Sequence, residues 1–398
     1  MERGGFYLKL GIAFFLVLLL GCTYTYRVVL WNTSDIGDYL KFPERAIDNS
    51  PPVFHFEKSE DPDVFKRIFP KAEYEYGRKK IERDWEEFLE STGTTAFIVI
   101  KRDTILYEGY FNGYRRDSVN VSFSVAKSFL SALIGIAVDE GLIGGVDDPV
   151  TKYLPQLDRE KFDKVTIRNM LMMSSGLRWR DGEVPWRDNP LHYYHPHLRK
   201  LLLNMRKFES EPGRYFHYNS YNTLLMGMVL EKAVGMSVTE WTEKKLWKPL
   251  GMEFPASWSI DSVEGGLEKT GSSLNARAID YAKLGRLFLR KGDWNGKRIV
   301  SEKWVVESTS RDRSAEGKDY YKSHKLLRKR SDFYYKYFWW GFSDNGSEYD
   351  YAACGHLGQY IYVSPSADVV IVRNGKKWGR INLWLDLMRH TAAGLRDR

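Results

Sequence analysis

Two runs of β-branched and aromatic residues stand side by side early in the chain. They cover residues 94–101 and 104–111, and only Arg102 and Asp103 separate them. Runs of this composition joined by two residues predict an antiparallel β-hairpin. Similar short runs return only towards the end, over residues 337–342, 359–363 and 369–373. The strands at the two ends of the chain are therefore expected to meet in one sheet.

The long stretch between these strands has the apolar spacing of helices. Helical patterns cover residues 128–140, 197–208, 223–234, 238–246 and 276–291, and Thr166 is placed to cap a short helix. Two further amphipathic patterns lie over residues 73–90 and from Ile381 to the C-terminus. We therefore predict an α+β fold, in which an antiparallel sheet is flanked by helices and a mostly helical insertion spans about residues 124–335.

The N-terminus carries the signs of export. Arg3 and Lys9 precede an apolar run over residues 10–20, which is short for a membrane span but typical of a secretory signal. The stretch Leu-Leu-Gly-Cys at 19–22 resembles a bacterial lipobox with Cys22 as the lipidation candidate, whereas the aromatic residues that follow suit an uncleaved anchor. Both alternatives predict a protein of the cell envelope, anchored to the membrane by its N-terminus, with its catalytic domain outside the cytoplasm.

Proline spacing suggests how the rest of the chain is divided. Residues 1–31 form the signal sequence or anchor, and residues 32–72, with five prolines among mixed charges, are expected to form an extended arm. Residues 73–398 follow as one domain. With 398 residues, of which 43% are hydrophobic, the chain is long enough to bury a large core.

Composition argues against several functions. The net charge of +8 is only moderately basic, and no helix-turn-helix or zinc-finger pattern accompanies it, so nucleic acid is not an expected partner. Two cysteines, Cys22 and Cys354, cannot build a disulfide framework. His192, His195 and His197 are close in sequence, but Pro196 breaks the helix that would align them, and no metal site is expected. The basic stretch 311–330 is expected to be a solvated loop, with contact to anionic lipid or envelope polymer as the alternative.

The candidate chemistry begins at Ser124 and Lys127, which form the one Ser-x-x-Lys in the sequence. Three residues of helix advance about 4.5 Å and return to nearly the same face, so the two side chains can share a proton. Burial and the positive end of the helix both lower the pKa of such a lysine towards the neutral form that can activate a serine. The alternative is a helix-capping serine followed by a surface lysine.

Two further stretches offer supporting groups. Tyr218 and Ser220 stand two residues apart before a predicted helix, and a tyrosine near a lysine can relay a proton. Gly355-His356-Leu357-Gly358-Gln359 enters a predicted strand, where glycines let a substrate approach the backbone and an edge strand can offer an N–H group to an oxyanion. Taken alone, a tyrosine in such an aromatic-rich segment is more often a core or turn residue, and the glycine stretch is a weak signal.

The motifs S-x-x-K, Y-x-S and H-x-G, in this order, resemble those of the penicillin-recognising serine hydrolases. The surrounding sequence, over about residues 73–395, is most similar to the 6-aminohexanoate-dimer hydrolase branch. The resemblance implies a β-lactamase/transpeptidase-like fold and neither metal nor cofactor. It also implies that Ser124 is the acylated nucleophile, Lys127 its base and Tyr218 the proton shuttle.

The remaining roles implied by the resemblance are supporting ones. Ser220 and His356 would complete the polar network, and the backbone N–H groups of Ser124 and Gln359 would form the oxyanion hole. Class C β-lactamases have Asn at the position of Ser220 and Lys at that of His356, so β-lactam turnover is not a firm expectation. We predict a serine hydrolase that cleaves an amide or ester bond in a small molecule or peptide. The alternative is a non-catalytic protein of the same fold that binds cell-wall peptides.

Overall fold

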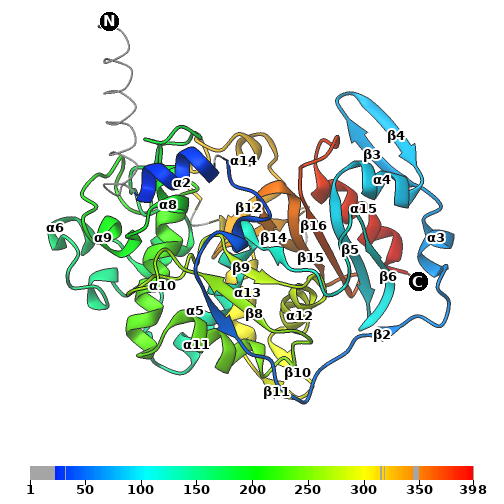
Figure 1. Ribbon diagram of the computed structural model, residues 1–398, viewed down its shortest axis with the longest axis horizontal. Coiled ribbons are helices and arrows are strands. Elements are labelled where there is room, and N and C mark those ends of the chain that lie inside the picture. Colours follow the sequence, from blue (N-terminus) through cyan, green and yellow to red (C-terminus); the bar gives the residue numbers. More distant parts are fainter. Residues whose placement is uncertain (1–22, 32, 314–315, 318, 344–348, 398) are drawn as a thin grey trace, which may run out of the picture.

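The predicted hairpin forms part of the largest sheet, between β16 (Val369–Gly375) and the edge strand β2 (Glu57–Lys58), as the computed structural model shows (Figure 1). The structure describes residues 23–31, 33–313, 316–317, 319–343 and 349–397. In order across the sheet, the strands are β12 (Phe333–Lys336), β13 (Trp339–Phe342), β14 (Asp350–Gly355), β15 (Gln359–Ser364), β16 (Val369–Gly375), β5 (Thr94–Lys101), β6 (Thr104–Tyr110) and β2 (Glu57–Lys58). The late strands reach the early ones through β16, which pairs antiparallel with β5. The prediction of one sheet built from both ends of the chain is confirmed.

Helices cover both faces of this sheet. Val370 and Ile361 point to α12 (Ala278–Leu289), where they leave room only for Gly285. Arg373, on the opposite face, lies over the ring of Trp384 in α15 (Trp384–Leu395). The same face carries α4 (Trp85–Ser91), whose Phe88 packs on Trp384. The predicted α+β class is therefore correct.

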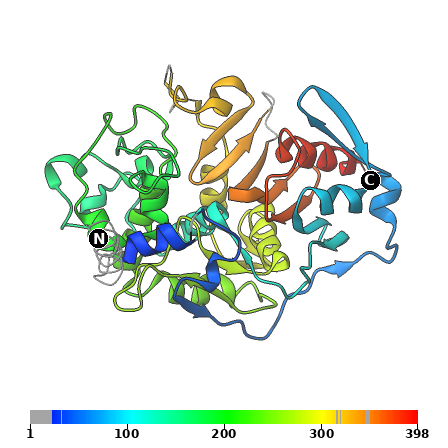
Figure 2. The same ribbon diagram turned by 45° about the horizontal axis from the view of Figure 1, so that its top comes forward.

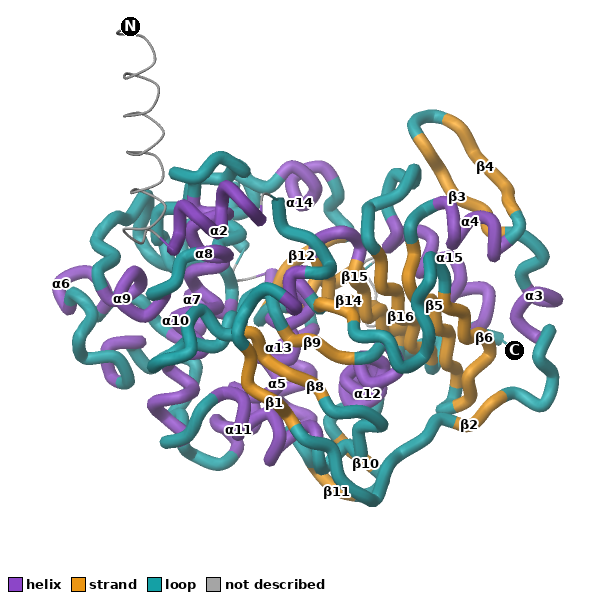
Figure 3. Tube along the Cα trace, viewed as in Figure 1, coloured by secondary structure: helices purple, strands orange, loops and turns teal. Residues whose placement is uncertain are grey.

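The helical insertion lies at one end of the sheet (Figures 2 and 3). Its main helices are α5 (Ala126–Asp139), α6 (Arg159–Phe162), α7 (Ile167–Leu171), α8 (Asp188–Tyr194), α9 (Leu198–Leu203), α10 (Ser220–Val234) and α11 (Val238–Thr242). Two more, α13 (Glu302–Thr309) and α14 (Lys325–Lys329), lead back to the sheet. Thr166 caps α7 as predicted, through a capping box with Asn169.

The helix predicted over residues 73–90 is wrong in its first half. Residues 72–83 form a hairpin of β3 (Ala72–Tyr76) and β4 (Lys79–Arg83), and only α4 is helical. Tyr74 and Ile81 stand seven residues apart, which matches two helical turns, but they are cross-strand partners. Gly77, with φ +64°, makes the turn between the strands.

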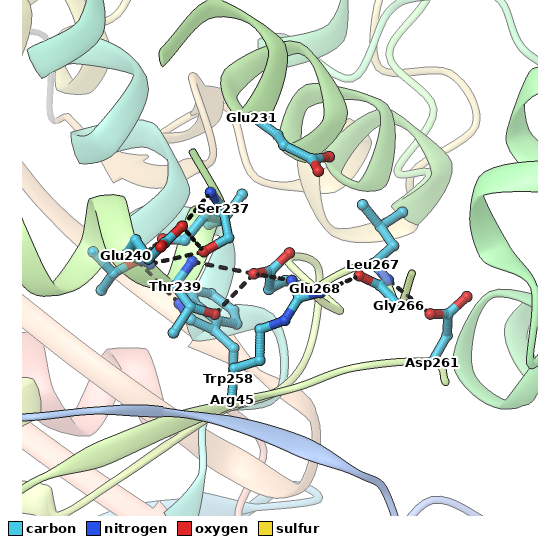
Figure 4. A network of polar contacts seen from close by, with 12 residues as sticks. Arg45, Glu231, Ser237, Thr239, Glu240, Trp258, Asp261, Gly266, Leu267 and Glu268 are labelled. Atoms are coloured by element: carbon cyan, nitrogen blue, oxygen red, sulfur yellow. Dashed lines mark hydrogen bonds and ion pairs between the residues drawn. The ribbon is translucent and has the colours of Figure 1, made fainter. Parts of the chain in front are cut away.

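The arm is part of the folded domain. Its strand β1 (Glu44–Ile47) joins a second sheet with β8 (Ala256–Ser259), β9 (Leu274–Ala276) and β7 (Asn120–Val121). Figure 4 shows how Arg45 of β1 reaches the fully buried Glu268, at 2.7 Å. Glu268 also accepts hydrogen bonds from the backbone and hydroxyl of Thr239. The arm therefore fixes the loop that carries Glu268.

The segment before the arm is a helix, α2 (Thr23–Trp31), that lies against α8 (Figure 1). Its Arg27 is buried and donates to the backbone carbonyl groups of Tyr194 and Asp261. Among the described residues, no helix is long and apolar enough to cross a membrane. The predictions for the apolar run and for Cys22 lie outside the described residues.

The buried apolar residues that the structure describes form two clusters. The larger one contains the sheet, α5, α10 and α12. The smaller one joins the N-terminal segment to the insertion, and we call it the aromatic cluster; its buried members are Val28, Phe42, Val121, Phe123, Tyr193 and Tyr194. It lies next to Ser124, because Phe123 is one of its members.

Candidate active site

Ser124 lies in a tight turn, η2 (Phe123–Val125), directly before α5. Phe123 has φ +41°, in the left-handed region that non-glycine residues seldom adopt. The neighbouring Ser122 holds this turn against β9, because its N–H and hydroxyl groups bond the carbonyl and N–H groups of Leu274 at 2.9 and 3.0 Å. The strained backbone is thus fixed beside the candidate nucleophile.

Lys127 is buried on the first turn of α5 and is only 1% exposed. Its Nζ donates to Ser124 Oγ at 2.8 Å and to the carbonyl oxygen of Gly271 at 2.6 Å. Burial lowers the pKa of Lys127 to about 7. Much of the lysine is therefore neutral at physiological pH and able to accept the proton of Ser124.

Tyr218 approaches Ser124 from the turn before α10. Its hydroxyl hydrogen-bonds with Ser124, and the Lys127 Nζ lies 5.2 Å from the centre of its ring. Burial raises the pKa of Tyr218 above its usual value, so the hydroxyl stays protonated. Trp340 of β13 stacks on the ring at 6.0 Å. The structure thus brings together the three residues on which the predicted chemistry depends.

The open edge of β14 lies beside the nucleophile. β14 pairs with β13 only as far as Ala352, so among the described residues no strand pairs with residues 353–355 on that side. A Cβ atom on Gly355 would lie 2.5 Å from Ser122 O and 3.2 Å from Ser124 N. The glycine predicted to admit substrate therefore admits the backbone of the Ser124 turn.

His356 follows Gly355 at the mouth of the cleft, on the turn η6 (His356–Gly358). Its ring lies edge-on to Phe123 and Trp378, with ring centres 5.3 and 5.8 Å apart. Desolvation by these walls lowers the pKa of His356, and nearby Glu183 opposes the shift. The imidazole is therefore neutral at pH 7, unlike the lysine of class C β-lactamases.

Gln359 is the first residue of β15, the strand next to β14 in the sheet, and it pairs with Gly355. Its side-chain amide group donates to the carbonyl oxygens of His356 and Gly375 and accepts from Asn374. The residue that follows Gly355 is His356, and both line the cleft, whereas Gln359 is not among the described lining residues.

These groups open into a cleft of about 350 Å³. Its walls are largely aromatic, with Trp179, Trp340 and Trp378 among the lining residues, and Ser220 also lies on the lining. Asp181 and Glu183 are the carboxylates of the lining. No lysine or arginine is among the described residues that line the cleft. The described lining is thus largely aromatic, and its charged side chains are acidic.

Sequence reasoning missed several of these residues. Gly271, Trp340 and Ser34 reach the site from distant parts of the chain, and no local motif marks them. His192 lines the cleft but is not near a metal cluster, since no group of metal-binding side chains occurs in the described part of the chain. Cys354 also lines the cleft, where burial raises the pKa of its thiol, as expected of an unreactive cysteine.

Comparison with known proteins agrees with this geometry. The beta-lactamase family model matches residues 81–382. The chain belongs to the beta-lactamase family. It is 28% identical to the 6-aminohexanoate-dimer hydrolase of Paenarthrobacter ureafaciens over 304 residues, which cover 73% of this chain and 74% of the relative. It is 22% identical to the teichoic acid D-alanine hydrolase of Staphylococcus aureus strain MRSA252, over 56% of this chain and 54% of that one.

Solved structures of other proteins share the fold of this chain. A Bacillus anthracis protein, named as a candidate 6-aminohexanoate-dimer hydrolase, superposes with a TM-score of 0.75 at 22% identity, covering 89% of this chain and 90% of the other. The penicillin-binding protein of Bacillus halodurans has a TM-score of 0.58 at 17% identity, covering 77% of this chain and 98% of the other. The fold and the family support serine hydrolase activity.

Proposed function

We propose that the protein cleaves an amide or ester bond through an acyl-enzyme on Ser124. The observation that carries this proposal is the hydrogen bond of 2.8 Å between Ser124 Oγ and the buried Nζ of Lys127. A lysine exposed to water would be protonated, and it could not accept a proton from serine. The site instead provides a base whose pKa lies near working pH, where general bases are most effective.

In the proposed mechanism, Ser124 Oγ attacks the carbonyl carbon while its proton passes to Lys127 Nζ. The tetrahedral intermediate collapses when the leaving nitrogen or oxygen takes a proton from the Tyr218 hydroxyl, which regains one from Lys127. Both groups hydrogen-bond with Ser124, so the relay needs no movement of the backbone. Water then attacks the acyl carbon, gives its proton to the same pair, and Ser124 is released.

For the oxyanion hole we propose the backbone N–H groups of Ser124 and His356. The sequence predicted Gln359 as the second donor. Gln359 lies on β15, the strand next to β14, and is not among the described residues that line the cleft. His356 instead lines the cleft together with Gly355, at the end of β14 that does not pair with β13. Donors held in this way stabilise the charge that develops on the carbonyl oxygen.

We further propose that the substrate has a neutral or amine-bearing acyl group. Asp181 accepts a hydrogen bond from Trp179 Nε1 at 2.6 Å, and Glu183 accepts one from Asn189 Nδ2 at 3.0 Å. A neutral His356 adds no positive charge to the opposite wall. An ammonium group is therefore attracted to this cleft and a carboxylate is repelled. The names of the two curated relatives, a 6-aminohexanoate-dimer hydrolase and a teichoic acid D-alanine hydrolase, support this choice, because 6-aminohexanoate and D-alanine both carry an amino group.

We also propose that the protein is exported and held at the membrane by its N-terminus. The support is the sequence of residues 3–22, in which two basic residues precede an apolar run and Cys22. Replacement of Cys22 by serine separates the two modes of anchoring. It should release a lipoprotein from the membrane fraction and leave a transmembrane anchor in place.

A matched set of p-nitrophenyl esters tests the proposed function. The acyl chains have equal length and end in a methyl, an ammonium or a carboxylate group. We expect kcat/KM to be lowest for the carboxylate, and turnover of every ester to fall by a factor of about 10⁴ or more in Ser124→Ala. Asp181→Asn should lower the preference for the ammonium ester while turnover of the methyl ester persists. Turnover that survives in Ser124→Ala would refute the mechanism.

A further inference from the structure

A second groove lies on the other side of α8 from the catalytic cleft. It has a volume of about 720 Å³, and α9 with the residues after it forms the opposite wall. Five basic side chains line it, against one carboxylate; the basic residues are Arg178, Arg180, Lys200, Arg206 and Lys207. The catalytic mechanism uses none of these residues.

The charge of the groove is only partly balanced by its neighbours. Its three arginines each have one carboxylate nearby, at N–O distances of 3.5 to 3.6 Å; these carboxylates belong to Glu209, Asp188 and Asp158. Lys200 and Lys207 have no carboxylate within 4.0 Å among the residues that the structure describes. Both lysines are exposed at the rim. The groove therefore retains positive charge that an anion can meet.

The floor of the groove is apolar. Leu191, Leu201 and Met205 are half-buried there. Tyr221 also lines the groove, and its hydroxyl donates to Asp188 at 2.9 Å. Contact with these apolar side chains would not stabilise a free phosphate or a hydrophilic polymer. A ligand with an anionic head and an apolar body matches both parts of the groove.

The groove also lies close to the N-terminal segment. His195, on its rim, packs against Tyr24 of α2 with ring centres 5.8 Å apart. In the sequence, α2 comes directly after the apolar run at 10–20. Tyr26, Leu30 and Trp186 around α2 are 44%, 61% and 67% exposed. Exposed tyrosine and tryptophan side chains favour the interface between membrane and water.

We propose that this groove binds the headgroup of an anionic phospholipid. The phosphodiester would lie between Lys200 and Lys207, and the glycerol with the first methylenes of the acyl chains would cover Leu201 and Met205. Bound lipid would then hold α8 next to the bilayer. Because α8 also forms a wall of the catalytic cleft, the cleft would lie close to the membrane surface. This binding site is separate from Ser124 and does not depend on the proposed hydrolysis.

Native mass spectrometry of the full-length protein in a non-ionic detergent tests the proposal, with phosphatidylglycerol as the probe. We expect one saturable adduct, weakened about tenfold or more in the double variant Lys200→Gln/Lys207→Gln, since each basic residue contributes substantially to the attraction of anionic lipid. The control is Lys79→Gln/Lys80→Gln, which removes equal charge from the exposed hairpin of β3 and β4 and should bind like the wild type. Both double variants should hydrolyse a soluble ester at the wild-type rate.

Three other probes decide the identity of the ligand. Phosphatidylcholine should bind much more weakly, and equal binding would refute a role for the lysines. Glycerol 3-phosphate should bind more weakly than phosphatidylglycerol, and equal binding would show a site for soluble phosphate instead of lipid. A glycerol phosphate polymer that displaces the lipid and binds more tightly would likewise overturn the proposal. Met205→Gln should weaken phosphatidylglycerol while leaving glycerol 3-phosphate unchanged.

Discussion

The reacting groups belong to the large hydrophobic core, whereas the outer wall of the cleft depends on the small aromatic cluster. Ser124 lies in the turn before α5, Lys127 in the first turn of α5, and Tyr218 before α10. The side chains of both helices are buried along most of their length. Tyr193 and Tyr194, on the outer wall, pack instead on Phe42 of the arm, with ring centres 5.6 and 6.1 Å apart. Phe123 belongs to this cluster and is the residue before Ser124.

This difference separates two aspects of function. Groups fixed by the large core have little freedom to move, as catalytic geometry requires. The outer wall depends on a few aromatic contacts with a segment near the N-terminus, so it can be altered without disturbing the core. We therefore expect changes in the core to lower kcat, and changes in the aromatic cluster to alter KM.

Among the variants that test this difference between core and aromatic cluster, Lys127→Arg should have the largest effect. Arginine keeps the positive charge but does not release its proton at working pH, so it cannot act as the base. We expect kcat/KM for a neutral ester to fall by about 10³. Circular dichroism should show an intact fold. Retention of more than about a tenth of the wild-type rate would mean that another group is the base.

Gly355→Ala should have the next largest effect. The added methyl group would lie 2.5 Å from Ser122 O, so β14 or the Ser124 turn must move. A shift of about 1 Å can lower a rate about 100-fold, and we expect kcat to fall by about 10 to 100-fold. Gly145→Ala is the control, because its methyl group meets nothing within 4 Å. Equal activity of the two variants would contradict the close packing of β14 on the nucleophile.

The pH profile reports on Lys127 directly. Because burial lowers its pKa to about 7, the lysine gains a proton below this pH and loses its function as a base. For a neutral ester, kcat/KM should fall about tenfold per unit below pH 6 and level off above pH 8. Tyr218 should add no alkaline decline below pH 10, because its pKa is raised. A profile that rises with a midpoint near 10 would show an ordinary lysine.

The smallest expected effect is that of Phe42→Leu. Loss of the ring loosens its contacts with Tyr193 and Tyr194, so KM should rise about threefold with kcat unchanged, a free-energy change of about 0.6 kcal/mol. Phe65→Leu is the matched control, since Phe65 is fully buried against Trp85, away from the cleft. Equal KM values for the two variants would show that the aromatic cluster does not shape the site.

The predictable parts of this protein are those specified by neighbouring residues. The hairpin of β5 and β6 follows from two β-rich runs and a two-residue turn, in which Arg102 and Asp103 both have positive φ. The approach of Ser124 to Lys127 follows from helical spacing. In both cases, the interacting groups are close in sequence, so the local pattern contains the information.

The unpredicted parts depend on residues far apart in the chain. Gly271 accepts a hydrogen bond from Lys127 across 144 positions, and no motif marks it. β1 and β7 have only four and two residues, too few for a periodic pattern. The arm looked extended because its prolines suggested no helix, yet Arg45 and Phe42 tie it to the loop of Glu268 and to the cleft. Tertiary packing, which the local pattern does not contain, determines these features.

The most direct test of the central claim is to locate the covalent adduct of a fluorophosphonate. The labelled protein is digested with trypsin, and the peptide of residues 117–127, which contains Ser118, Ser122 and Ser124, is fragmented in a mass spectrometer. We predict one adduct, on Ser124, and none on the Ser124→Ala variant. An adduct on any other residue, or undiminished labelling of the variant, would contradict the assignment of Ser124 as the nucleophile.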